Sequence, residues 1–236
     1  MTTAAIYDEP TEPGLPPSGF EFDAARAALV ITDPQNDFLS PNGATWSVFG
    51  ASIKENSTIR HIDELLSAAK DSGLTVAISP HYYYPSDHDW RFGGPLERFM
   101  HGVGMFARTN PLTLDGFDGS GADYLDQFKD RILDGRTVIA SPHKLVGPQS
   151  NDLVLQLRKR GVTQVLLAGM AANLCTESHL RELIEQGFEV VVIKDATAGP
   201  RLPEGDGYLA ALVNFRFLAS AVWTTADALG ALQRAR

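Results

Sequence analysis

Short apolar runs alternate with amphipathic stretches along most of this chain. Runs that are apolar at nearly every position are typical of strands buried on both faces of a parallel sheet. Between them, apolar residues recur at helical spacing, as from Ile59 to Ala69 before Gly73. The predicted strands are residues 28–32, 74–78, 137–140, 164–168, 189–193 and 221–223. This alternation predicts an α/β fold with a doubly wound, six-stranded, mostly parallel sheet and helices on both faces.

Two segments depart from the alternation. Residues 1–24 are rich in proline and glycine and show no periodicity, so we predict an extended N-terminal arm before a single domain over residues 25–236. Residues 79–134 form a long irregular stretch rich in aromatic residues, glycine and proline. Because connections of this length usually cover a site or carry short elements of their own, we expect this stretch to lie near the site.

Charge and cysteine content narrow the possible functions. The formal net charge of -9 repels nucleic acid and anionic membrane surfaces, and no basic cluster offsets it. No apolar run approaches the roughly 18 residues that a membrane-spanning helix requires. The single cysteine excludes an intramolecular disulfide, and the N-terminus lacks the basic start and apolar run of a signal peptide. We therefore expect a cytoplasmic protein with a small-molecule partner, and neither a nucleic-acid nor a membrane partner.

Three reactive side chains follow predicted strands. Asp33 comes directly after the first strand, Lys144 shortly after the third and Cys175 shortly after the fourth. Ligands of parallel sheets bind at the carboxyl ends of the strands, so these residues are expected at one edge. A carboxylate there provides a general acid and base, and an ammonium group favours the anionic form of a nearby thiol. We therefore predict a nucleophilic Cys175 with a lowered pKa.

The motifs around these residues resemble the isochorismatase-like cysteine hydrolase superfamily, specifically its amidohydrolase branch. They are the run from Thr32 to Phe38 (TDPQNDF), the lysine at 144 and the run from Gly169 to Cys175 (GMAANLC), in the order that the superfamily shows. The similarity extends from about Ala28 to Leu232. It implies a three-layer α/β/α domain, and members of this family are commonly dimers or tetramers, so we expect a homodimer or homotetramer.

The resemblance also implies roles for individual residues. Asp33, Lys144 and Cys175 would form an Asp-Lys-Cys catalytic triad. A cis peptide bond between Met170 and Ala171 would turn backbone N–H groups into the cleft, where those of Ala171 and Cys175 would form an oxyanion hole. Cys175 would attack a carbonyl and form a thioester, Asp33 would protonate the leaving amine, and water would release the product. The expected enzyme is a hydrolase of C–N bonds other than peptide bonds, with a small carboxamide, carbamoyl or ureido substrate.

Further residues are candidates for substrate or metal contacts. Phe38 belongs to the first motif, and Tyr82 and Trp90 belong to the aromatic part of the long segment, where rings can stack on a planar substrate. Nicotinamidases of the family bind a metal through an Asp-x-His motif and a second histidine. Here Ser79 replaces that aspartate, which leaves His81 and His88 as the remaining metal-ligand candidates. We expect no metal and no cofactor.

Two alternatives stay open at this point. One is isochorismatase-type hydrolysis of a vinyl ether, with Asp33 as the acid and Cys175 incidental. The other is a non-catalytic interaction protein or thiol sensor on the same fold, which would use Cys175 for redox chemistry. Replacing Cys175 distinguishes the amidohydrolase from the vinyl ether hydrolase, and the reactivity of the thiol distinguishes the sensor.

Overall fold

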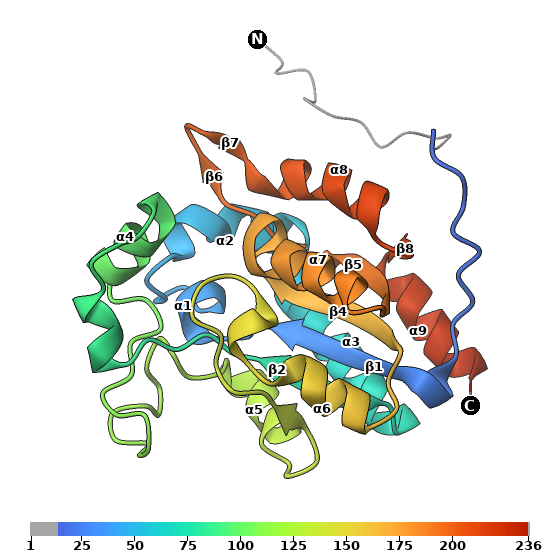
Figure 1. Ribbon diagram of the computed structural model, residues 1–236, viewed down its shortest axis with the longest axis horizontal. Helices are drawn as coiled ribbons and strands as arrows, with labels where there is room; N and C mark the ends of the chain where they lie inside the picture. Colours follow the sequence, from blue (N-terminus) through green and yellow to red (C-terminus); the bar gives the residue numbers. More distant parts are fainter. Residues whose placement is uncertain (1–13, 236) are drawn as a thin grey trace.

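A six-stranded parallel sheet forms the centre of the computed structural model, which describes residues 14–235 (Figure 1). Every pair of neighbouring strands is parallel. The strands lie in the order β3-β2-β1-β4-β5-β8, so the direction of winding reverses between β1 and β4. They are β1 (Ala27–Thr32), β2 (Thr75–Ser79), β3 (Val138–Ile139), β4 (Gln164–Met170), β5 (Glu189–Ala198) and β8 (Ala221–Trp223). This confirms the predicted fold class.

Helices cover both faces of the sheet, which gives three layers. One face is covered by α2 (Trp46–Glu55), α3 (Thr58–Ser72), α5 (Asp126–Ile132) and α9 (Thr225–Arg234). The other face is covered by α6 (Leu153–Lys159), α7 (Glu177–Glu185) and α8 (Gly207–Leu218). The shorter elements are α1 (Asn36–Leu39), α4 (Pro95–Gly102) and the hairpin of β6 (Arg201–Leu202) and β7 (Gly205–Asp206).

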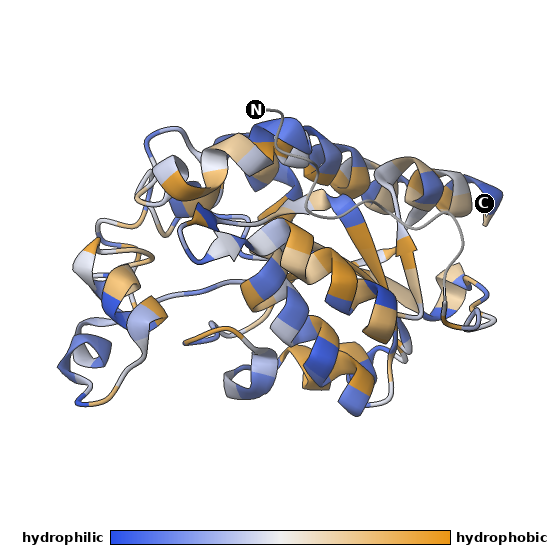
Figure 2. Ribbon diagram, turned by 90° about the horizontal axis from the view of Figure 1, so that it is seen from above, coloured by the Kyte–Doolittle hydropathy of each residue, from blue (hydrophilic) through white to orange (hydrophobic). Residues whose placement is uncertain are grey.

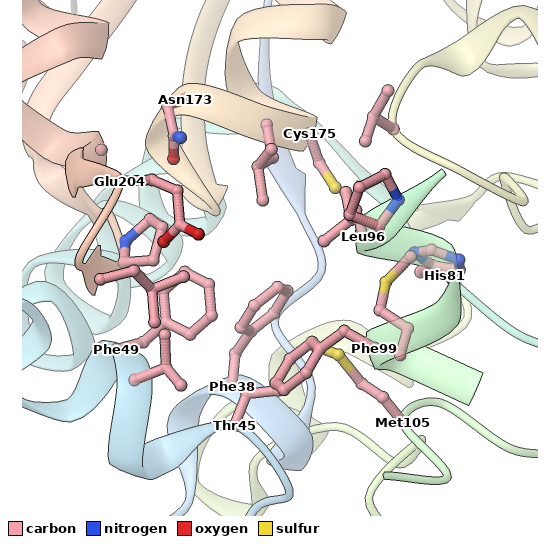
Figure 3. Close-up of a pocket in the computed structure, with 18 of the residues that line it drawn as sticks. Phe38, Thr45, Phe49, His81, Leu96, Phe99, Met105, Asn173, Cys175 and Glu204 are labelled. Atoms are coloured by element: carbon pink, nitrogen blue, oxygen red, sulfur yellow. The ribbon is translucent and has the colours of Figure 1, made fainter. Parts of the chain in front are cut away.

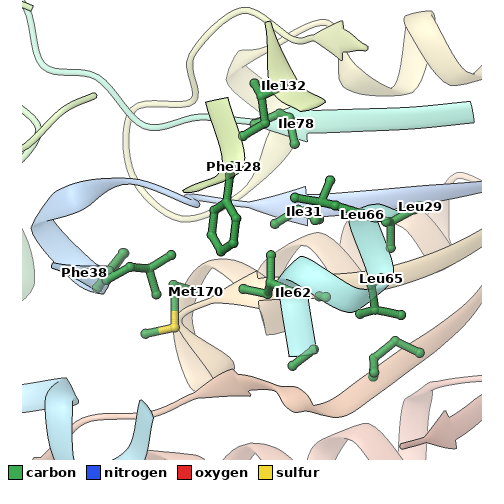
Figure 4. Close-up of a cluster of buried hydrophobic side chains, with 14 of the residues drawn as sticks. Leu29, Ile31, Phe38, Ile62, Leu65, Leu66, Ile78, Phe128, Ile132 and Met170 are labelled. Carbon is green, nitrogen blue, oxygen red and sulfur yellow. The ribbon is translucent and has the colours of Figure 1, made fainter. Parts of the chain in front are cut away.

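Successive side chains along each strand point to opposite faces of the sheet, which divides the hydrophobic core into two clusters. In β1, Leu29 and Ile31 join the cluster under α3, whereas Ala28 and Val30 join the cluster under α6 and α7. All six residues of β1 are buried, which explains its unbroken apolar run. The strands are largely hydrophobic while the helices mix both classes of residue (Figure 2). Figure 4 shows the first cluster, where Phe128 and Ile132 of α5 lie beside Ile31 and Ile78.

The structure describes the long segment in full but only the last part of the predicted N-terminal arm. The long segment carries α4 and α5, as such a length suggests. Most of the predicted N-terminal arm, residues 1–13, lies outside the described residues. From residue 14 the chain reaches the sheet through an irregular stretch and one 3₁₀ turn, Ala24–Arg26, and Phe20 and Phe22 pack edge-on against Trp223. The division between arm and domain stays a prediction, as does the oligomeric state. No helix within residues 14–235 is long and apolar enough to cross a membrane.

The carboxyl ends of β1 and β4 approach each other very closely. Gly169 has a φ of +109°, and a Cβ atom placed there would lie 2.1 Å from the backbone oxygen of Thr32. The Thr32 hydroxyl lies 2.9 Å from the Met170 carbonyl oxygen and donates to it. Only glycine satisfies both the backbone conformation and the spacing at this point. The approach positions the residues that follow both strands next to each other.

We therefore expect Gly169→Ala to destabilise the protein much more than an ordinary glycine substitution. The added methyl group meets backbone atoms that cannot move independently, so we expect a loss of about 3 kcal/mol or more in unfolding free energy. Gly73→Ala is the matched control, because Gly73 also has a positive φ, +73°, but its Cβ would meet nothing within 4 Å. We expect it to cost about 1 kcal/mol. Denaturant unfolding of both variants is the measurement, and equal losses would contradict the steric argument.

Candidate active site

Asp33 lies at the switch point of the sheet, directly after β1. Its side chain is fully buried, and its φ of 47° places it in the left-handed region that few residues other than glycine adopt. The Asp33 N–H donates to the Ser79 carbonyl oxygen at 3.1 Å, which ties this turn to the end of β2. Such a constrained, buried carboxylate at the carboxyl end of a parallel strand is typical of a functional site.

Cys175 follows β4 on the opposite side of the same switch point. It lies in a single π-helical turn, Ala172–Thr176, that leads into α7, and it is 4% exposed. The peptide bond between Met170 and Ala171 is cis. The thiol donates to the Leu145 carbonyl oxygen at 4.0 Å, and the backbone N–H groups of Ala171 and Cys175 lie close enough to the sulfur to lower its pKa. They are the groups expected to form an oxyanion hole, a role that stays a prediction.

The pKa of Cys175 is raised, which contradicts the lowered pKa expected from the sequence. Burial is the largest cause, and the charge and hydrogen bond of the neighbouring Asp33 carboxylate add to it. The two backbone N–H groups lower the pKa of the thiol but do not offset burial. In the unliganded site the thiol is therefore protonated at neutral pH, with the carboxylate positioned to accept its proton.

Lys144 does not join Asp33 and Cys175, so the structure corrects the expected triad. The Lys144 ammonium contacts Asp87 Oδ2 at 2.5 Å and the Tyr82 carbonyl oxygen at 3.0 Å. The residue that reaches Asp33 is His143, whose Nε2 lies 2.8 Å from Asp33 Oδ1. His143 pairs in parallel with His81 beyond the end of β3, and successive side chains of extended backbone point to opposite sides. The histidine therefore enters the site and the lysine points away from it.

Two further buried histidines surround this pair. His81 lies with its ring centroid 4.7 Å from that of His143, and His81 Nε2 donates to the Lys144 carbonyl oxygen at 3.1 Å. Burial and the neighbouring His143 hold the pKa of His81 well below its usual range. His179 Nδ1 donates to the Cys175 carbonyl oxygen at 2.7 Å, and Nε2 bonds the Ser79 hydroxyl at 2.8 Å. His143 and His179 were missed from the sequence; their only signal is a place near a strand end and one helical turn after Cys175.

The site opens into a cavity of about 530 Å³ whose walls are mostly apolar (Figure 3). Side chains from α2, α4 and the loop after β4 form these walls, and Cys175 and His81 lie at one end. Glu204 and Asp206 of the β6-β7 hairpin also line it, and among the described residues no lysine or arginine does. The main apolar side chains are Phe38, Phe49, Leu96, Phe99, Met105 and Leu174. The cavity therefore suits an uncharged, apolar group.

Only one of the three predicted substrate contacts lies on this cavity. Phe38 is part of its wall, although its contact with substrate stays a prediction. Tyr82 is buried elsewhere, with its ring against Phe117 and the Arg108 guanidinium. Trp90 is 42% exposed and packs edge-on against Tyr83. Neither Tyr82 nor Trp90 lines this cavity, and their contact with substrate stays a prediction.

The predicted pair of metal-ligand candidates is also separated. The Tyr83 ring lies 4.7 Å from the His81 ring and 6.3 Å from the His88 ring, by centroids, and His88 contacts His101 instead. A different group comes together around His81. One ligand atom from each of Asp33, His81, His143 and Cys175 lies within 4.8 Å of the others.

The structure thus places a buried cysteine, aspartate and histidine at the switch point of a parallel sheet. The chain belongs to the isochorismatase domain family, whose pattern it matches over residues 27–227. The ureidoacrylate amidohydrolase RutB of Methylobacterium radiotolerans is 28% identical over 198 residues, which are 78% of this chain and 72% of that protein.

Solved structures share the fold. A cysteine hydrolase from Pseudomonas syringae pv. phaseolicola 1448A superposes with a TM-score of 0.77 at 20% identity, over 95% of this chain and 100% of that one. N-carbamoylsarcosine amidase from Thermoplasma acidophilum superposes with a TM-score of 0.61 at 17% identity, over 85% and 96% of the two chains. The chain is thus an isochorismatase-family protein with amidohydrolases among its relatives.

The buried histidines predict a specific acid sensitivity. Burial, with the neighbouring His143, lowers the pKa of His179 from 6.5 to about 3. The unfolded chain takes up a proton below about pH 6.5 and the folded chain does not, so the unfolding free energy is fully present above pH 6.5 and falls as the pH drops towards 3. Each such histidine contributes a slope of about 1.4 kcal/mol per pH unit. Denaturant unfolding between pH 7 and 4.5 should show a shallower slope in His179→Gln, whereas an unchanged slope would contradict the assignment.

Proposed function

We propose that this protein is a cysteine amidohydrolase that cleaves the C–N bond of an amide with an apolar body. The observation that carries the proposal is the arrangement around the Cys175 sulfur. The sulfur lies within 4.8 Å of an oxygen of the buried Asp33 carboxylate, close to the backbone N–H groups of Ala171 and Cys175, and at the end of an apolar cavity. A nucleophile, a base and two donors for a developing oxyanion are the groups that acyl transfer requires.

The first half of the reaction forms a thioester. As the amide binds, Asp33 accepts the thiol proton and the sulfur attacks the carbonyl carbon. The N–H groups of Ala171 and Cys175 stabilise the negative charge that develops on the carbonyl oxygen. Asp33 then gives the proton to the leaving nitrogen, the C–N bond breaks and the amine or ammonia departs. Because the resting thiol is protonated, proton transfer accompanies the attack, which requires a base in direct contact with the sulfur.

The second half releases the acid. Asp33 removes a proton from a water molecule, the resulting hydroxide attacks the thioester, and the thiolate leaves and regains a proton. His143 holds Asp33 throughout, because its Nε2–H donates to one carboxylate oxygen and leaves the other oxygen for proton transfer. His143 is thus a positioning residue in place of the lysine that the family resemblance implies.

The cavity supports an apolar substrate rather than an acidic one. The name of the Methylobacterium relative gives ureidoacrylate, which carries a carboxylate. Such a group needs a cation, and the charged groups that residues 14–235 place on this cavity, besides histidine, are the acidic Glu204 and Asp206. Leu96, Phe99 and their neighbours favour an alkyl or aryl amide, because each buried CH₂ group contributes about 0.8 kcal/mol.

Replacing site residues should separate the roles of neighbouring side chains. On an amide that the wild type cleaves, Cys175→Ala should lose at least about 10³-fold in kcat, because no thioester forms. His143→Ala should lose about 10²-fold and shift the pH profile of kcat/KM, since the Asp33 carboxylate loses its hydrogen bond. Lys144→Met is the matched control, because the adjacent side chain points to Asp87, and its activity should stay within about threefold. Measured release of ammonia or amine is the readout.

Four outcomes would contradict this assignment. Full turnover of the amide by Cys175→Ala would exclude the thioester. Cleavage of a vinyl ether that survives Cys175→Ala and is severely reduced in Asp33→Asn would indicate acid-catalysed vinyl ether hydrolysis. A severe loss in Lys144→Met with little effect of His143→Ala would restore the lysine to the site. No hydrolysis by the wild type across alkyl, aryl and ureido amides would instead favour a thiol sensor.

The apolar cavity predicts how rate depends on substrate. Along a series of straight-chain primary amides from two to six carbons, kcat/KM should rise about three- to fourfold per CH₂ group until the cavity is filled. A terminal carboxylate on the six-carbon amide should reverse this gain. Phe99→Arg should restore activity on the acidic amide, because Phe99 lies on the wall and is 41% exposed. Phe92→Arg is the control, since Phe92 is 89% exposed and lies off the cavity, so no change is expected.

A further inference from the structure

We propose that Asp33, His81, His143 and Cys175 form a site for one divalent ion of the zinc class, and that the bound ion blocks the thiol. The four side chains come from the ends of three different strands and from the turn after β4. All four are at least 96% buried, and one ligand atom from each lies within 4.8 Å of the others. Zinc ligands at tetrahedral distances lie about 3.3 to 3.8 Å apart, so an ion requires a contraction of about 1 Å.

The hydrogen bonds of His81 prepare it as a ligand. Its Nε2 lies 3.1 Å from the Lys144 carbonyl oxygen, which can only accept, so Nε2 carries the ring proton. Nδ1 therefore holds a free lone pair, and this atom is buried without a hydrogen-bond partner. A histidine that donates one ring N–H to a backbone carbonyl and presents the other nitrogen is the usual arrangement of a metal ligand.

His143 and Asp33 also keep unused lone pairs. His143 donates from Nε2 to Asp33 Oδ1, and both His143 Nδ1 and Asp33 Oδ2 are buried without partners. An ion bound by both His143 and Asp33 would take His143 Nε2 as its ligand, because Nδ1 lies on the far side of the ring, and the ring proton would move from Nε2 to Nδ1. Unpartnered atoms such as Asp33 Oδ2 and His81 Nδ1 are unusual, because buried polar groups are nearly always hydrogen-bonded. Neither the thiol mechanism nor packing uses His81 Nδ1. An ion would satisfy such groups together.

Charge and access also fit a zinc-class ion. The carboxylate and the thiolate each carry one negative charge when bound, the two imidazoles are neutral, and a divalent cation balances the set. Thiolate and imidazole favour zinc and its relatives over magnesium or calcium, which take oxygen ligands. Cys175 and His81 face the cavity of about 530 Å³, which provides an entry path.

The consequence is reversible inhibition rather than metal catalysis. Four protein ligands close a tetrahedral site and leave no open position for water or substrate. A thiolate bound to the ion cannot attack a carbonyl, and removing the ion returns the thiol to Asp33. Occupancy by the ion and turnover therefore exclude each other. The binding claim does not depend on the proposed amidohydrolase activity.

Cobalt titration of the full chain, after treatment with a chelator, is the direct test. Cobalt(II) reports thiolate ligation by a sulfur-to-metal charge-transfer band and tetrahedral geometry by its visible bands. We expect one cobalt per chain, displaced by one zinc, and loss of the charge-transfer band in Cys175→Ser. His81→Gln should weaken binding at least tenfold while keeping the thermal unfolding temperature near that of the wild type. His88→Gln is the matched control, since His88 lies outside the cluster, and it should bind as the wild type does.

A second measurement keeps the claim testable if His81→Gln unfolds. Alkylation of the single cysteine by iodoacetamide should be slowed by one equivalent of zinc and restored by chelator. No stoichiometric cobalt binding would overturn the proposal, as would wild-type cobalt spectra in folded His81→Gln or alkylation that zinc does not slow. These readouts need no substrate, so failure of the hydrolase proposal and failure of the metal proposal are distinguishable.

Discussion

The close contact between the ends of β1 and β4 is the constraint on which the site depends. Parallel strands bring their carboxyl ends to one edge of the sheet. Only at the switch point do the connections that follow two neighbouring strands diverge to opposite faces and leave room between them. Gly169 permits the approach, and the Thr32 hydroxyl joins β1 to the Met170 carbonyl. Asp33 and Cys175 are the residues that leave these two strands. Their contact is therefore a product of backbone packing, and neither side chain needs to be flexible to reach the other.

A site built in this way has to manage a buried negative charge without a buried cation. The ammonium group of Lys144, the residue after His143, pairs with Asp87 instead. The Asp33 carboxylate relies on one imidazole N–H, and the thiol stays protonated beside it. This arrangement keeps one proton between a base and a nucleophile, ready to move when a carbonyl arrives. Once the thiol proton has left the cluster, the Asp33 carboxylate and the Cys175 thiolate together carry two negative charges. One divalent cation would balance them, which is why the same four side chains are suited to an ion.

The sequence predicts the parts of this structure that depend on local pattern. Strands buried on both faces have a distinctive apolar run, so the sequence predicts the strands of the sheet. The ends of those strands in turn predict the edge at which Asp33 and Cys175 lie. The local pattern does not predict that His143, rather than Lys144, enters the site. That choice depends on a one-residue register set by pairing with His81 beyond a two-residue strand, and a shift of one residue reverses which side chain enters the site. Aromatic composition likewise does not distinguish a cavity wall from packing within a long loop, and Tyr82 and Trp90 lie off the cavity.

Catalysis and selectivity are carried by different parts of the fold. Asp33, His143 and Cys175 follow strands of the sheet, whereas the cavity walls come largely from α2, α4 and the β6-β7 hairpin, which lie outside it. Changes in those walls leave the backbone contact between β1 and β4 untouched, so the substrate can change while the nucleophile stays in place. The absence of a cation among the described wall residues is then a property of these added elements. The proposed chemistry therefore depends on the sheet, and the proposed preference for an apolar body depends on the segments that lie over it.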